Sequence, residues 1–203
     1  MSRDRHPHGG TVDLSTLQAQ QTLVVKQRFT MMINRYEVRA ATADGSDGAM
    51  LAFVEQKRMK LKEEVTLFSD DTKTAVFAAF KARSVIDLGA TYDIKDHSGT
   101  PIGLFKKDFA KSLLRSTWHL EGTDGFRATG QERSMFVALL RRFSDISFLP
   151  YHFDFVAGDR PIFSVEKKFK LFRDKYTVTI HDPQADRRLI VAMAVALDAL
   201  QGR

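Results

Sequence analysis

The pattern of apolar and polar positions between residues 23 and 181 is that of a β protein. Short segments rich in aromatic and β-branched residues alternate apolar with polar positions, as strands with one buried face do. Twelve segments of this kind can be marked: Leu23–Phe29, Tyr36–Val38, Ala52–Lys57, Val65–Phe68, Ala75–Lys81, Tyr92–Ile94, Ile102–Lys106, Trp118–Glu121, Gly125–Thr129, Tyr151–Val156, Pro161–Lys167 and Tyr176–Ile180. The alternation therefore predicts a protein built mainly from short strands.

Turn signals separate alternate strand candidates. Tight turns favour Asp, Gly and Ser, because Gly tolerates positive φ and Asp bonds its own backbone. Such clusters occur at Asp44–Gly48, Ser69–Asp71, Asp96–Gly99, Gly122–Gly125 and Gly158–Asp159. Repeated hairpins at this spacing predict an up-and-down antiparallel sheet. Twelve strands would not stay flat and open, so we expect closure into a twelve-stranded β-barrel.

The C-terminal segment predicts what fills this barrel. Leu189–Leu197 is apolar on every side, and Asp182 and Pro183 before it offer an N-cap acceptor and a first-turn proline. A helix that is hydrophobic all round must be buried all round. We therefore predict a buried α-helix over residues 183–200, threaded through the barrel. A membrane anchor is the competing interpretation, but a spanning helix needs about 20 apolar residues.

Two other segments complete the predicted organisation. Residues 133–143 place Met135, Phe136 and Leu139 on one stripe and predict one additional short helix near 133–143, packed over the barrel mouth or wall. A basic amphipathic helix touching a membrane surface is the alternative. Residues 1–20 are polar, with no stretch that could serve as a signal peptide. We expect a disordered tail over 1–20, followed by one barrel domain over 21–203.

Composition narrows the chemistry. The 203 residues contain no Cys, which excludes a disulfide framework, a thiol nucleophile and Cys-ligated metals. No His-x-x-x-His pair, Gly-rich phosphate loop or nucleophile elbow is present. We therefore predict a non-enzymatic protein with no catalytic residues, no metal site and no cofactor. With no transmembrane segment expected, the chain is predicted to be cytoplasmic, at most peripheral to a membrane.

An ordered set of segments resembles the tubby C-terminal-like superfamily, and within it the LURP-one-related and phospholipid scramblase-like proteins. The segments are Leu23–Phe29 before Tyr36–Val38, then Tyr92–Gly103 leading to Phe105–Lys107 and Trp118, and finally Asp174–Ile180 followed by Asp186–Asp198. The resemblance implies a twelve-stranded closed barrel around a hydrophobic C-terminal helix. It also implies a binding module, since tubby proteins bind phosphoinositides.

The chain departs from the scramblase pattern. It has no Cys for palmitoylation, no proline-rich N-terminal arm and no compact acidic segment just before the last helix. Asp174, Asp182 and Asp186 are scattered instead. Neither a calcium site nor a scrambling activity is therefore carried over to this chain.

Strand direction predicts an uneven distribution of charge, because alternate strands of such a barrel run the same way. Lys and Arg number 31 against 25 Asp and Glu, a net charge of +6. The turn aspartates should gather at one rim: Asp44, Asp47, Asp70, Asp71, Asp96, Asp124 and Asp159. The bases that end the strands leaving those turns should gather at the other: Lys57, Arg58, Lys81, Arg83, Lys106, Lys107, Lys167 and Lys168.

Two interpretations of the basic rim remain open. Turns favour Asp for backbone reasons, and lysines at strand ends discourage edge aggregation, so the asymmetry needs no ligand. Alternatively, the rim binds an anionic membrane surface through phospholipid headgroups. A protein-interaction or regulatory scaffold with a protein partner is the runner-up function. Nucleic acid is a less favoured partner, since the bases are spread over many strand ends and the aromatics follow strand alternation.

Overall fold

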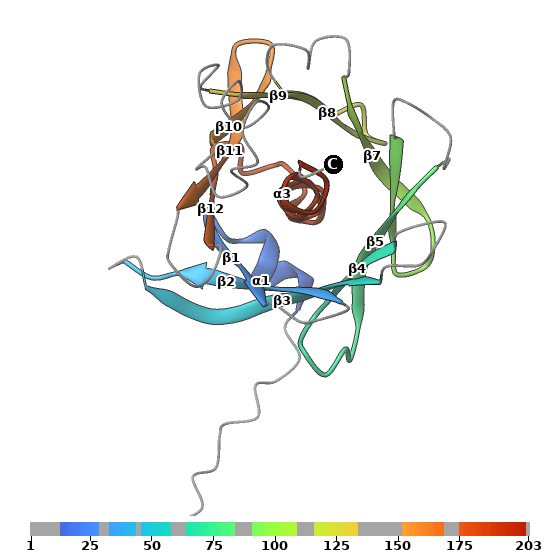
Figure 1. The fold of residues 1–203 in the computed structure, drawn as a ribbon, viewed down its shortest axis with the longest axis vertical. Coiled ribbons are helices and arrows are strands. Elements are labelled where there is room, and N and C mark those ends of the chain that lie inside the picture. Colours follow the sequence, from blue (N-terminus) through green and yellow to red (C-terminus); the bar gives the residue numbers. More distant parts are fainter. Residues whose placement is uncertain are drawn as a thin grey trace, which may run out of the picture.

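Figure 1 shows the protein as a computed structural model that describes residues 13–28, 33–43, 46–57, 64–83, 91–108, 116–133, 152–168 and 175–201. Twelve strands lie within these residues: β1 (Thr22–Arg28), β2 (Asn34–Ala41), β3 (Asp47–Lys57), β4 (Glu64–Phe68), β5 (Val76–Ala82), β6 (Thr91–Asp96), β7 (Pro101–Lys107), β8 (Thr117–Gly122), β9 (Arg127–Glu132), β10 (His152–Ala157), β11 (Arg160–Lys168) and β12 (Lys175–Ile180).

The strands form one closed antiparallel barrel. Each strand pairs with its neighbours in sequence, and β1 pairs with β12 to complete the ring, for example at Val24 opposite Thr177. Closure leaves none of the twelve described strands with a free edge on which another chain could add. The predicted twelve-stranded antiparallel barrel is confirmed.

A helix, α3 (Arg187–Gln201), occupies the centre of the barrel (Figure 1). Its residues Ile190 to Leu197 are at most 1% exposed, so the helix is buried on every side, as its sequence predicts. A Cβ on Gly103 of β7 would lie 2.9 Å from the Leu189 Cδ2 atom. Glycine at this position therefore lets the barrel wall approach the start of the helix.

The helix begins later than predicted. Residues 182–185 form a turn, in which the Asp182 carbonyl accepts the Ala185 N–H at 3.2 Å and its carboxylate accepts the Gln184 N–H at 2.9 Å. The Asp186 carboxylate instead accepts the Arg188 N–H at 2.8 Å and its carbonyl accepts the Ile190 N–H, so Asp186 caps α3. The predicted start at 183 is wrong because two aspartates were available as caps and the nearer one serves the helix.

A short helix, α1 (Leu14–Gln18), lies within the segment predicted to be a disordered tail. Leu17 is fully buried in the core. The Gln18 side chain donates to the Ala185 carbonyl and accepts the Arg187 N–H, both at 3.0 Å. These contacts join α1 to the start of α3, so the prediction of disorder is wrong for residues 13–20. Of the helix predicted over 133–143, only Arg133 lies among the described residues.

Aromatic side chains fill the space between α3 and the wall. Phe155 stacks on Phe163 with ring centroids 4.2 Å apart, and both side chains are at most 1% exposed. A Cβ on Gly130 would lie 2.3 Å from the Phe155 ring, so glycine on β9 makes room for this stack. These rings belong to the core and are not available for stacking on nucleic acid bases.

Candidate functional site

The barrel has two chemically different ends. Five hairpin turns lie at one end, which we call the turn rim, between β2 and β3, β4 and β5, β6 and β7, β8 and β9, and β10 and β11. The opposite end, where β1, β3, β5, β7, β9 and β11 finish, is the basic rim. Arg58 lies outside the described residues, as does Asp44 of the turn rim.

Aspartates of the turn rim bond their own turns. Asp96 accepts the N–H groups of Ser98 and Thr100 at 2.9 and 3.0 Å, and Asp124 accepts that of Phe126 at 3.0 Å. Asp70 accepts from the Ser69 and Thr72 hydroxyls. The Ser98 hydroxyl, followed by these turn N–H groups, holds the pKa of Asp96 below its ordinary value. These aspartates therefore serve local backbone structure.

Strand alternation divides the predicted basic residues into two groups. Lys57, Lys81 and Lys106 each follow an inward-facing residue and point away from α3, as does Arg83 beyond the end of β5. Lys107 and Lys167 lie in register opposite Trp118 and Tyr176, two buried residues of the barrel interior. Lys168 ends β11, but its side chain is outside the described part of the structure.

The two inward-facing lysines contact aromatic side chains of the interior. The Lys167 side chain is 7% exposed, and its Nζ lies 3.8 Å from Asp198 of α3 and 5.4 Å from the Tyr176 ring centroid. Lys107 Nζ lies 5.7 Å from the Trp118 ring centroid. Of the two, Lys167 is buried and Lys107 is half-buried, because both face the interior side of their strands, opposite to the outward side of Lys106.

Outward cations of the basic rim pair with carboxylates on neighbouring strands. Lys81 lies 3.6 Å from Glu64, Arg83 2.5 Å from Asp93, and Lys106 3.2 Å from Glu121. The further pairs are Arg28 with Glu37, Arg35 with Glu55, and Arg133 with Asp154. The hydrogen bond from Arg83 lowers the pKa of Asp93, and that from Arg133 lowers the pKa of Asp154.

In each of these pairs the cation is the more exposed partner. The Arg83 side chain is 58% exposed against 33% for Asp93, and that of Lys106 is 45% exposed against 29% for Glu121. Lys57, at the end of β3, is exposed as well. A solvent molecule or surface that approaches this end therefore meets ammonium and guanidinium groups before carboxylates.

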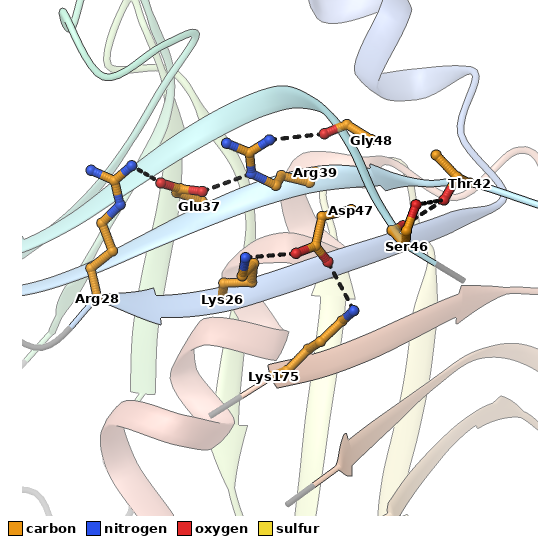
Figure 2. A network of polar contacts seen from close by, with 9 residues as sticks. All are labelled: Lys26, Arg28, Glu37, Arg39, Thr42, Ser46, Asp47, Gly48 and Lys175. Atoms are coloured by element: carbon orange, nitrogen blue, oxygen red, sulfur yellow. Dashed lines mark hydrogen bonds and ion pairs between the residues drawn. The ribbon is translucent and has the colours of Figure 1, made fainter. Parts of the chain in front are cut away.

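A cluster on the outer wall was not predicted from the sequence (Figure 2). The Asp47 carboxylate bridges two lysines, with Oδ2 2.6 Å from Lys26 Nζ on β1 and Oδ1 2.8 Å from Lys175 Nζ on β12. Beside it, Glu37 of β2 binds both Arg28 and Arg39. Asp47 is one of the turn aspartates predicted for one rim; it begins β3, and its carboxylate contacts the ladder that closes the barrel.

No sequence signal could have identified this cluster. Lys26 and Lys175 are 149 positions apart in the chain, and only the pairing of β1 with β12 places them opposite each other. The hairpin of Asp47 is closed by the Thr42 N–H donating to the Ser46 carbonyl, so the turn ends at residue 46, short of the predicted Gly48. Asp47 thereby becomes a strand residue.

His119 forms a second polar group on the outer wall. Its Nε2 lies 3.3 Å from Asp108 and its Nδ1 3.1 Å from the Thr129 hydroxyl. A catalytic histidine that activates a hydroxyl would need backbone N–H groups nearby to bind an oxyanion. Around Thr129 the backbone belongs to β9, which pairs with β8 and β10, so its N–H groups take part in these ladders. Within the described ranges, no group of three or more His, Asp or Glu side chains is placed to hold a metal ion.

The fold defines the class of protein: a closed barrel of twelve strands around its own C-terminal helix is a tubby-like domain. The sequence model of the LURP-one-related family matches residues 50–198, and the chain belongs to this family of the tubby-like superfamily. No curated protein and no solved structure matches the chain. In the part of the chain that the structure describes, no helix is long and apolar enough to cross a membrane.

Proposed function

We propose that this LURP-one-related chain is a non-enzymatic, cytoplasmic binding module that docks its basic rim on the anionic phospholipid headgroups of a membrane. The observation that carries the proposal is the arrangement of the rim pairs, in which each cation is more exposed than the carboxylate beside it. Cross-strand carboxylates hold the cations in place, while the positive groups face outward. A Lys or Arg near an anionic bilayer surface contributes about 1 kcal/mol to binding.

The structure indicates which residues to change. Lys57, Lys81 and Lys106 are outward and exposed, so replacing them with Gln removes charge without opening the core. Lys107 and Lys167 are unsuitable, because changing them disturbs the barrel interior. Arg127 and Arg160, whose side chains are 80% and 65% exposed at the turn rim, supply a matched control.

We expect the Lys57→Gln/Lys81→Gln/Lys106→Gln variant to bind phosphatidylserine vesicles about 100-fold more weakly than the wild type, at about 1 kcal/mol per lysine. Co-sedimentation measures the affinity, and circular dichroism verifies the fold. Wild-type binding should weaken as salt rises. The Arg127→Gln/Arg160→Gln control should bind like the wild type. An equal loss per charge removed in this control, or no binding by the wild type, would overturn the proposal and favour a protein-interaction role.

A further inference from the structure

The ladder that closes the barrel places like charges side by side. Lys26 of β1 lies directly opposite Lys175 of β12. Like charges directly opposite each other destabilise a sheet. The side chains of Lys26 and Lys175 are only 23% and 17% exposed, so water alone screens them incompletely. This position therefore requires an anion.

Asp47 supplies that anion from a different hairpin. One carboxylate oxygen lies 2.6 Å from the Lys26 ammonium group and the other lies 2.8 Å from that of Lys175. The two lysines therefore contact the carboxylate from opposite sides (Figure 2). The β2–β3 register shifts twice near this residue, between Val38 and Arg39 and between Arg39 and Ala41. Such bulges re-aim side chains locally. The carboxylate reaches the lysines because the hairpin departs from a regular ladder.

We propose that Lys26 and Lys175 form a phosphate-binding site, and that Asp47 occupies it as an internal ligand which a phosphate group displaces. Two ammonium groups that hold the two oxygens of one carboxylate can hold two oxygens of a phosphate in the same way. A phosphate monoester carries about −1.5 to −2 charges at neutral pH against −1 for the aspartate, which favours exchange. The ligand is a phosphate monoester, from a lipid headgroup or free in solution.

This site differs from the exposed lysines of the basic rim. Its membrane-bound form rests on the proposed function, whereas binding of soluble phosphate does not. The Asp47→Asn variant keeps the side-chain shape, removes the internal anion and leaves the two lysines facing each other. Without phosphate we expect its melting temperature to lie below that of the wild type.

Inorganic phosphate is the first probe. Thermal unfolding across a phosphate titration should show an affinity about tenfold higher in Asp47→Asn than in the wild type, since one charge-assisted competitor is gone. Adding Lys26→Gln to Asp47→Asn should lower that affinity about fivefold. Asp93→Asn is the matched control, because it makes the same chemical change but frees only Arg83, and its phosphate response should equal that of the wild type.

Three outcomes of the phosphate titration would overturn the inference: no phosphate-dependent rise in the melting temperature of Asp47→Asn, an equal rise in Asp93→Asn, or no effect of Lys26→Gln. If Asp47→Asn does not fold, Lys26→Gln is tested in the wild-type background at high phosphate, where it should reduce the rise in melting temperature. An unchanged rise there would equally overturn the inference.

Vesicles distinguish the two sources of phosphate. Phosphatidylinositol 4-phosphate carries a phosphate monoester, so Asp47→Asn should bind vesicles that contain it more tightly than the wild type does. On phosphatidylserine vesicles the two proteins should bind equally. A phosphate response without such a gain assigns the site to soluble phosphate. Failure of phosphatidylserine binding alone would overturn the proposed function and leave this inference intact. Equal gains on both vesicles would show a general charge effect and overturn it.

Discussion

Two aspartates, one inside the barrel and one outside, connect distant parts of the chain in different ways. Asp198 of α3 accepts hydrogen bonds from Tyr36, at 3.0 Å, and from Tyr176, and it lies 3.8 Å from Lys167. Asp47 bridges Lys26 and Lys175 on the outer wall. The Asp198 side chain is 10% exposed and that of Asp47 26%. We therefore expect removal of the Asp198 carboxylate to cost more stability than removal of the Asp47 carboxylate. We expect only the Asp47 carboxylate to exchange with anions from solvent.

The largest effect should follow removal of the inner carboxylate. Asp198→Ala leaves the Lys167 ammonium in the interior without this partner, and breaking a buried pair from one side costs about 3–5 kcal/mol. Urea unfolding measures the loss. Glu64→Ala, which removes a carboxylate from the exposed Lys81, is the matched control and should cost less than about 1 kcal/mol. Equal losses would contradict the comparison.

The tyrosines that hold Asp198 should have intermediate effects. Tyr36→Phe and Tyr176→Phe each remove one hydroxyl donor and keep the ring, so we expect each to lower the free energy of unfolding by about 1 kcal/mol. Because both hydroxyls bond the same carboxylate, the losses should not be additive in the double variant. Strict additivity would indicate that the two tyrosines act independently of Asp198.

The smallest effect concerns the outer carboxylate and depends on pH. The contacts with the ammonium groups of Lys175 and then Lys26 lower the pKa of Asp47 from 3.8 to about 2. A carboxyl with a depressed pKa in the folded protein stabilises the fold above its unfolded pKa, and this contribution is lost as pH falls through the folded value. The stability difference between wild type and Asp47→Asn should therefore be full above about pH 4 and be lost as the pH falls through about 2. A constant difference across a pH series of thermal unfolding curves would contradict this assignment.

The architecture followed closely from the sequence, for reasons that are local. Period-two alternation and Asp or Gly turns specify strands and hairpins, and a segment without a polar face such as Leu189–Leu197 must be enclosed. Element boundaries were harder, as the start of α3 illustrates. Asp182 and Asp186 both have capping chemistry, and the contacts of α3 with Gln18, far away in sequence, accompany the choice of Asp186.

The candidate site was predicted only in part. Strand direction determines the end of the barrel at which strand-terminal bases such as Lys57, Lys81 and Lys106 lie. Their carboxylate partners depend on the register between strands, which the sequence alone does not specify. The adjacent Lys106 and Lys107 have different roles, because one faces Glu121 on the outside and the other faces the Trp118 ring.

By itself, the sequence determined the barrel, its central helix and the separation of turn aspartates from strand-end bases, because hydrophobic period and turn chemistry act over a few residues. Only the tertiary structure decided which charges meet. The closing ladder joins the first strand to the last, and it places Lys26 against Lys175 with Asp47 between them. Such pairings depend on interactions between residues far apart in the chain, and closure of the barrel is what brings them within reach.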